Sequence, residues 1–137
     1  NMGVVKLNGD GLHISFSIRS SIASRKLMLA QRVRAVAALA GGTVAERGVY
    51  PGWQYKRESK FRDTLLAAYK DLTGKDGVVE ATHGGLECGL LMEKIPGLDA
   101  GSMGPELHDV HSVRERLNVP STERTYELVC ELLRRSC

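Results

Sequence analysis

The sequence predicts an α/β fold in which helices alternate with short strands. Residues 12–18 alternate apolar and polar side chains with a period of two, which is typical of a strand that packs one face. Two later segments, 27–40 and 58–72, instead repeat apolar residues at helical spacing. Because glycine and proline pairs separate these segments, the pattern changes between strand and helix several times within 137 residues.

The first fifty residues are expected to form a strand, a helix and a second strand. The helix over 27–40 ends at Gly41-Gly42, because glycine readily adopts the left-handed conformation that closes a helix. Residues 43–49 then resemble a short strand, and Pro51-Gly52 ends this piece. Two strands and one helix bury little surface, so we expect the piece to depend on the rest of the fold.

After this break, the chain is expected to alternate helices and strands to its end. The expected elements are a helix over 58–72, a strand over 78–82, a helix over 86–92, a strand over 98–103, a loop over 104–118 and a last helix from Pro120. The strand at 78–82 leads into His83-Gly84-Gly85, so a glycine turn stands between a strand and a helix. Such a turn is a common location for binding sites.

Composition excludes several classes of protein. The chain is 42% hydrophobic and 26% charged, as in globular domains. Its start has no basic flank followed by an apolar core, and no apolar run approaches the length of a membrane span, so we expect neither a signal peptide nor a span. The net charge of +3 gives no indication of nucleic-acid binding. Three cysteines match neither a disulfide framework nor a CxxC metal site, which favours a reducing cytoplasm.

The loop over 104–117 contains two imidazoles, from His108 and His111, together with three carboxylates. These are ligands that zinc accepts. A solvated polar loop has the same composition, and the four dispersed histidines form no HExxH pair. Both interpretations therefore stay open, and the residues alone do not assemble a complete metal site.

Two other features suit an anionic group on a ligand. Gly84-Gly85 would let backbone N–H groups approach a carboxylate or phosphate at the start of the following helix, although a tight turn without a ligand fits equally well. Arg19 follows the alternating strand on its polar side and has the planar fork that suits a carboxylate. An exposed, solvated arginine is the alternative.

Five sequence blocks together resemble the aminoacyl-histidine dipeptidases. The blocks, in chain order, are Tyr50-Pro51-Gly52-Trp53, His83-Gly84-Gly85-Leu86-Glu87-Cys88-Gly89-Leu90, Ser102-Met103-Gly104-Pro105, Asp109-Val110-His111-Ser112 with Glu115-Arg116-Leu117, and Ser121-Thr122-Glu123-Arg124 followed by Tyr126-Glu127. These enzymes are cytosolic Xaa-His dipeptidases, close to carnosinase in activity, within the superfamily of di-zinc amidohydrolases and carboxypeptidases. The similarity covers nearly the whole chain.

The resemblance implies that this chain is a C-terminal portion of a longer enzyme. Residues 1–49 would be the C-terminal part of a lid and dimerisation domain, a partial β-α-β unit. Residues 50–137 would be the C-terminal part of the α/β metallopeptidase catalytic domain. The other metal ligands and the general-base glutamate would lie upstream, so no catalytic residue is expected here and the isolated chain is expected to be inactive.

The resemblance also implies roles for four residues. His111 matches the C-terminal metal ligand of the family, whereas His108 matches no required histidine and is expected at the surface. Arg19 resembles the lid arginine that takes the substrate's terminal carboxylate, and Gly85 and Leu86 would supply backbone donors to the substrate. The chain departs from the pattern after Ser112, where proline and an acidic residue are usual, which puts the local geometry of that turn in question.

The function implied for the full-length protein is hydrolysis of Xaa-His dipeptides with two divalent metal ions, for which zinc is expected. Such an enzyme would be a cytoplasmic metallopeptidase and a homodimer, with a dipeptide and the upstream part of the same chain as its partners. The alternative is a non-catalytic lid or dimerisation fragment that acts only as an interaction module. Metal content and Xaa-His hydrolysis distinguish the two.

Overall fold

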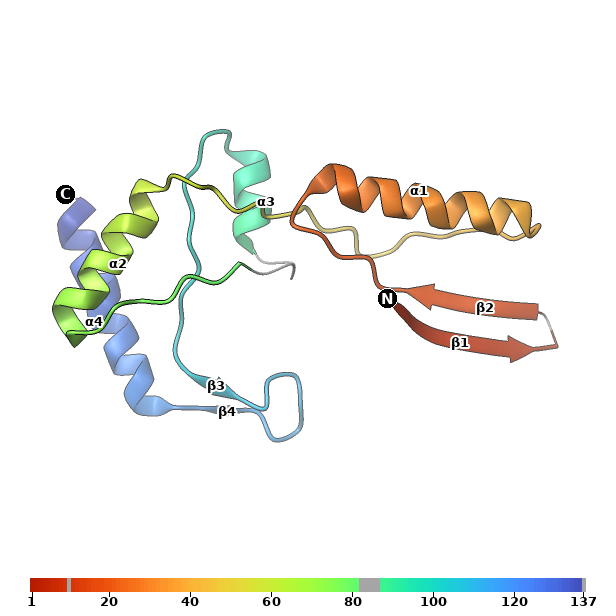
Figure 1. The fold of residues 1–137 in the computed structure, drawn as a ribbon. Helices are drawn as coiled ribbons and strands as arrows, with labels where there is room; N and C mark the ends of the chain where they lie inside the picture. The colour runs from red at the N-terminus through yellow and green to blue at the C-terminus, as the bar shows by residue number, and fades with distance from the viewer. Residues whose placement is uncertain (10, 82–86, 137) are drawn as a thin grey trace. The chain divides into compact units, whose positions relative to one another are not determined.

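The computed structural model describes residues 1–9, 11–81 and 87–136. Contacts within the chain divide it into two units, each of which combines two separate stretches of sequence (Figure 1). Unit 1 consists of Asn1–Tyr55 and Ala81–Pro96, and unit 2 of Lys56–Glu80 and Gly97–Cys137. Helices and short strands occur in both units.

Unit 1 begins with an antiparallel hairpin of β1 (Met2–Asn8) and β2 (Gly11–Phe16), in which Val5 lies opposite Ile14. The sequence predicted β2 but missed β1. Both strands are exposed along their whole length, so the packed face expected from the alternation is wrong for this chain. Leu12, for example, keeps 63% of its surface exposed.

Helix α1 (Ala23–Leu39) follows the hairpin, as predicted. It ends at the two glycines: Gly41 has a φ of 71°, and the N–H of Gly42 donates to the carbonyl of Ala37 at 2.7 Å. This pattern satisfies carbonyl groups that the end of a helix leaves free. No residue of α1 is buried.

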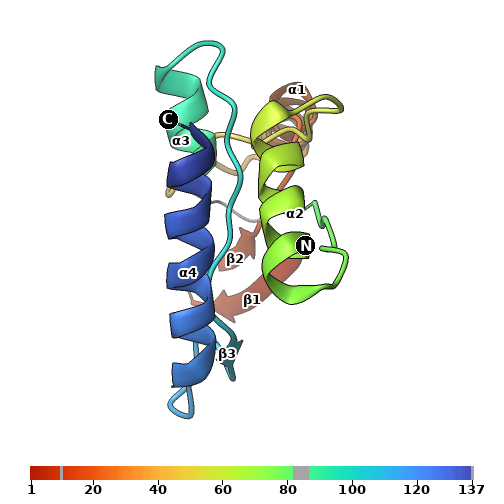
Figure 2. The same cartoon turned by 90° about the vertical axis from the view of Figure 1, so that its left-hand side faces the viewer.

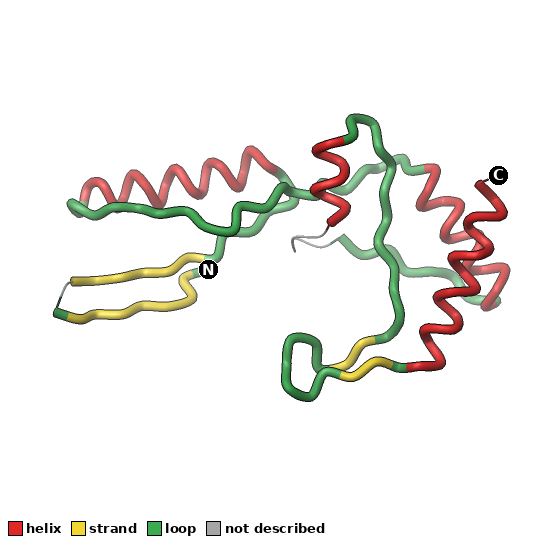
Figure 3. The backbone as a smooth tube through the Cα atoms, turned by 180° about the vertical axis from the view of Figure 1, so that it is seen from behind, coloured by secondary structure: helices red, strands yellow, loops and turns green. Residues whose placement is uncertain are grey.

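The strand predicted over 43–49 is wrong. These residues form a loop, drawn in green in Figure 3. Side chains of α1 fasten this part of the chain: Arg34 forms an ion pair with Glu46 at 2.5 Å, and the ammonium of Lys26 donates to the carbonyl of Tyr50. A strand needs a neighbour that accepts its backbone hydrogen bonds, and within the described residues this segment has none.

The segment 51–53 makes unusually close backbone contacts in unit 1. A Cβ atom on Gly52 would lie 2.5 Å from the carbonyl oxygen of Ser21, in the connection between β2 and α1. A Cβ atom on Gly89, in helix α3 (Glu87–Lys94), would lie 3.4 Å from the carbonyl oxygen of Pro51. The segment therefore packs against both the β2–α1 connection and α3.

Unit 2 is built on two predicted helices, α2 (Lys60–Thr73) and α4 (Val119–Ser136). They lie side by side in Figures 1 and 2. Their contact forms the hydrophobic core of the described chain, which consists of Ala68, Leu128 and Leu132 with Leu65 and Tyr69 packed against them. An ion pair at 2.7 Å joins Asp71 of α2 to Arg135 of α4.

Two side chains cap the start of α2. The Ser59 hydroxyl accepts the N–H of Arg62 at 3.1 Å, and a carboxylate oxygen of Asp99 accepts the N–H of Phe61 at 3.0 Å. The hydrogen bond from Phe61, then that from Ser59 and the nearby charge of Lys56, lower the pKa of Asp99 below its ordinary value of 3.8. Asp99 thus holds the distant segment 97–101 against the first turn of α2.

Two further predicted strands are wrong. Within the described residues, neither 78–81 nor 98–103 is a strand. The predicted loop over 104–118 instead contains a short antiparallel hairpin, β3 (Leu107–His108) with β4 (Arg116–Leu117). None of the helices in the described residues is long and apolar enough to cross a membrane.

Candidate functional site

The hairpin β3–β4 is anchored to the start of α4. Its base is fixed by Glu106, whose N–H donates to the Ser121 hydroxyl at 2.8 Å and whose carbonyl accepts the N–H of Asn118 at 3.0 Å. The Glu106 carboxylate also accepts from the Asn118 amide at 2.7 Å and from Arg124 at 3.0 Å. The loop that includes His111 therefore extends from a hairpin whose first strand is hydrogen-bonded to the start of α4.

The backbone of this loop is strained at two positions. Asp109 has a φ of 52° and His111 a φ of 63°, in the left-handed region that L-amino acids with a Cβ disfavour. Each such residue costs of the order of 1 kcal/mol. Since strain persists only where surrounding contacts impose it, the contacts of this loop are informative.

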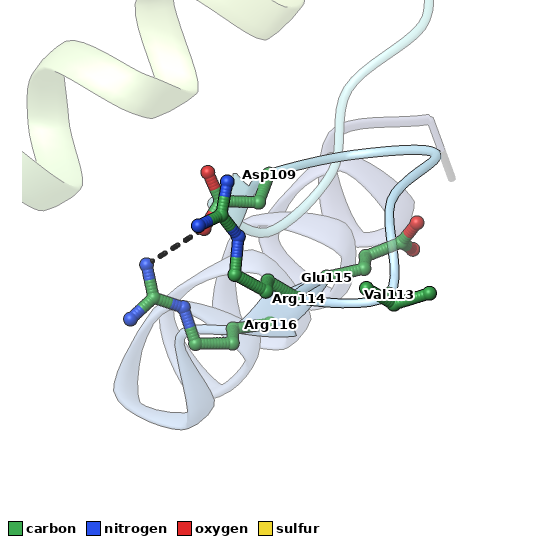
Figure 4. A pocket seen from close by; sticks show the side chains of 5 residues that line it. All are labelled: Asp109, Val113, Arg114, Glu115 and Arg116. Carbon is green, nitrogen blue, oxygen red and sulfur yellow. Dashed lines mark hydrogen bonds and ion pairs between the residues drawn. The ribbon is translucent and has the colours of Figure 1, made fainter.

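Four side chains impose that conformation. The His111 N–H donates to Glu115 Oε2 at 2.8 Å, and Arg116 binds the Asp109 carboxylate at 3.0 Å (Figure 4). The Ser112 hydroxyl donates to the Asp109 carbonyl at 2.6 Å and accepts the N–H of Arg114 at 3.1 Å. A compact turn thus forms after Ser112, where the resemblance implies a proline that this chain lacks.

The His111 side chain is suited to bind a metal ion, but only as one ligand. It is exposed, and within the described residues its ring makes no hydrogen bond or ion pair, so an imidazole nitrogen is available. Nowhere in residues 1–9, 11–81 and 87–136 do three or more His, Cys, Asp or Glu residues gather as a metal ion would require. The donor set fits one position of a metal site.

An open pocket of about 600 Å³ lies beside the loop (Figure 4). It is lined by Asp109, Val113, Arg114, Glu115 and Arg116. Two acidic and two basic side chains line it, and Val113 is fully exposed. This mixture of charges gives the pocket no preference for one sign of ligand, and we assign it no substrate.

Arg19 lies in the connection between β2 and α1, in unit 1. The expectation that it lies on the polar face of the strand is wrong, because β2 ends at Phe16. Its side chain is exposed and makes no hydrogen bond or ion pair with the described residues, so the guanidinium is free to meet an anion. The close contact of Gly52 with Ser21 fixes the backbone just beyond Arg19.

Of the other residues singled out from the sequence, the structure describes His108. Gly85 and Leu86 lie outside the described residues. His108 is in β3, exposed and opposite Arg116, which agrees with its expected place at the surface. His111 belongs to unit 2 and Arg19 to unit 1, and each is described within its own unit.

Sequence reasoning missed the residues that shape the His111 loop. Asp109, Glu115 and Arg116 stand in a block of the resemblance, but the sequence predicts no separate role for them. The spacing of four residues between His111 and Glu115 is the one local feature that could have indicated a contact. Left-handed backbone at Asp109 was not predictable from residue type beyond the mild preference of aspartate for it.

Comparisons with known proteins cover almost all of this chain. No protein-family model matches it. It is 33% identical over 134 residues to the cytosol non-specific dipeptidase of Escherichia coli (strain K12), a match that covers 98% of this chain and 28% of that protein. The crystal structure of aminoacylhistidine dipeptidase from Vibrio alginolyticus matches with a TM-score of 0.78 and 26% identity, again over 98% of this chain and 28% of the other.

The chain therefore spans between a quarter and a third of the length of these two proteins. The structural match confirms the predicted fold class, a partial α/β domain.

Proposed function

Because this chain resembles a C-terminal portion of the aminoacyl-histidine dipeptidases over nearly its whole length, we propose that it is part of a metal-dependent dipeptidase. The full-length enzyme would hydrolyse Xaa-His dipeptides with two divalent metal ions, for which zinc is expected. The observation that best supports this proposal is the His111 loop. In this loop several hydrogen bonds fix the backbone, and the exposed ring of His111 makes no hydrogen bond or ion pair with the described residues, so it can supply one ligand to a metal ion held mainly by another part of the protein.

The residues of this chain would bind and orient rather than catalyse. A bound divalent metal would supply Lewis-acid polarisation of the scissile carbonyl. His111 would hold one metal, and Arg19 would bind the free carboxylate of the dipeptide through its two parallel N–H groups. Gly85 and Leu86 are proposed as backbone donors to the substrate. The general base would belong to the upstream part of the enzyme.

The test compares two histidines of the β3–β4 hairpin in the longer protein. His111→Ala should lower the metal stoichiometry and abolish turnover, because a lost ligand opens the coordination shell. His108→Ala should leave metal content and kcat near those of the wild type. Equal metal content and activity in the two variants would refute the assignment of His111.

The second candidate is an interaction module without catalytic activity. It is favoured by the exposure of both strands of the β1–β2 hairpin and by the absence of buried residues in α1. A cytoplasmic homodimer of the full-length protein fits both candidates.

The 137-residue chain should hydrolyse no Xaa-His dipeptide, even with added zinc, and metal-dependent turnover by the purified chain would contradict our view that its site is incomplete.

A further inference from the structure

We propose that Glu115 is a positioning residue that sets the direction of His111 before any metal binds. The inference rests on the proposed function in one respect, namely that His111 is a metal ligand. It adds that the ligand's backbone is preset by a hydrogen bond from its own N–H to a carboxylate four residues later, at 2.8 Å.

The backbone geometry shows why this contact matters. His111 has a φ of 63°, and the direction of its Cα–Cβ bond follows from that angle. In the extended region that histidine prefers, the imidazole would leave the loop in a different direction. The bond to Glu115 Oε2 holds the N–H, so it opposes that relaxation directly.

Three other contacts of the loop end on Asp109, two residues earlier. The side chain of Arg116, the hydroxyl of Ser112 at 2.6 Å and the N–H of Ser112 at 3.1 Å all bind Asp109. The two bonds from Ser112 close a turn that spans His111 and restrain its backbone from both sides, but none of the three contacts binds an atom of His111. Among the described residues, Glu115 is the acceptor for the N–H of His111.

Because the contact between Glu115 and His111 is local, its effect on the loop can be measured separately from any effect on the stability of unit 2. Glu115 is exposed and lies outside the hydrophobic core that joins α2 to α4. Removing its carboxylate should therefore change the loop and leave the folding of unit 2 intact. If Glu115 had a merely structural role, its removal would lower the melting temperature and leave the His111 amide and the zinc affinity unchanged.

Three variants separate positioning from direct metal binding. Glu115→Gln keeps a carbonyl oxygen that can accept the N–H of His111, but it removes the negative charge. Glu115→Ala removes the acceptor. Val113→Ala is the matched control, because Val113 is in the same loop and fully exposed.

The first measurement is NMR of the 137-residue chain without metal. In Glu115→Ala, the His111 amide should exchange with solvent about two- to tenfold faster, as expected for the loss of one hydrogen bond, and its N–H to Hα coupling constant should change. Glu115→Gln should stay close to the wild type, and Val113→Ala should match it. An unchanged His111 amide in Glu115→Ala would overturn the inference, whatever the full-length enzyme does.

The second measurement is zinc affinity of the longer protein, by competition with a chelator. Glu115→Ala should weaken binding about tenfold or more, as is typical for residues that orient a ligand, with the melting temperature unchanged. Glu115→Gln should restore most of the affinity, and failure of this rescue would overturn positioning in favour of direct ligation.

The His111→Ala variant separates the two proposals in the same assay. If His111→Ala loses a zinc ion and Glu115→Ala binds zinc as the wild type does, the positioning role is refuted while the proposed function stands. If His111→Ala keeps both its zinc stoichiometry and its affinity, the assignment of His111 as a ligand fails, and the positioning role fails with it.

Discussion

Gly52 should tolerate no side chain, because two stretches of backbone meet at its Cα. A Cβ atom there would lie 2.5 Å from the carbonyl oxygen of Ser21, 2.9 Å from the carbonyl carbon of Ser21 and 3.0 Å from the carbonyl oxygen of Ser20. Cβ atoms in folded proteins essentially never lie closer than 3.0 Å to another heavy atom, so the Cβ atom and the oxygen would have to move apart by at least 0.5 Å. All three atoms are backbone, so no side chain can rotate away to relieve it.

We therefore expect Gly52→Ala to lower the free energy of unfolding of unit 1 by about 3 kcal/mol, the upper end of the range for overpacking. Gly3→Ala is the matched control within the same unit. A Cβ atom on Gly3 would meet its nearest atom, the Asn1 side-chain oxygen, at an ordinary distance of 3.5 Å. Its effect should be within about 0.5 kcal/mol of zero, as for a surface substitution.

Trp53 makes the assay specific. It is the single tryptophan of the chain, it is half-buried, and it is the neighbour of Gly52, so its fluorescence reports on unit 1 during urea unfolding. Far-UV circular dichroism follows the helices of both units in the same samples. If the unfolding midpoints of Gly52→Ala and Gly3→Ala coincide in Trp53 fluorescence, the close approach of 51–53 to the β2–α1 connection is refuted.

Two further predictions concern Asp99 and Arg19. The pKa of Asp99 is lowered in the folded chain, so its stabilising contribution is complete above its ordinary value of 3.8 and is lost as the pH falls through the lower folded value. Urea midpoints measured from pH 5 to pH 2 should therefore fall more steeply for the wild type than for Asp99→Asn, and parallel curves would contradict the capping role. Arg19→Lys should reduce kcat/KM of the full-length enzyme for free dipeptides, because lysine lacks the bidentate fork. The reduction should correspond to a loss of transition-state stabilisation of the order of 1.5–3 kcal/mol. The reduction should largely disappear with substrates whose carboxylate is amidated, and an equal reduction for both would assign Arg19 another role.

The helices could be predicted from the sequence because their determinants are local. The apolar stripe over 58–72 predicted α2, and the helix start near Pro120 predicted α4. The pair Gly41-Gly42 predicted the end of α1. Each of these features acts within a few residues of its own position. For the same reason, the prediction needed no knowledge of the rest of the chain.

The strands could be predicted only where a partner was close in sequence. β2 was found, and β1 could have been found, because a Gly-Asp pair such as Gly9-Asp10 between two short runs of β-prone residues commonly indicates a hairpin. The segments 43–49 and 98–103 have no strand partner among the described residues, and a few β-prone residues alone do not make a strand.

The candidate site was predictable from the resemblance only in part. His111 was identified by the block that contains it and Arg19 by its resemblance to the lid arginine, and both side chains are exposed, with no hydrogen bond or ion pair to the described residues. Glu115 acts through a hydrogen bond to the backbone, and a backbone N–H is the same in every non-proline residue. Such a contact therefore has no distinct sequence pattern, and only coordinates reveal it.

The order in which the two units use the chain determines where it can be divided. The polypeptide passes from one unit to the other after Tyr55, after Glu80 and after Pro96. A cut after Tyr55 leaves all of unit 2 in one fragment, and a cut after Pro96 leaves all of unit 1 in one fragment. A cut after Glu80 gives two fragments, and neither contains a whole unit. We therefore expect each fragment to fold only when it binds the other. That junction is the natural split point for a complementation pair, in which recovery of the Trp53 signal on mixing would report reassembly.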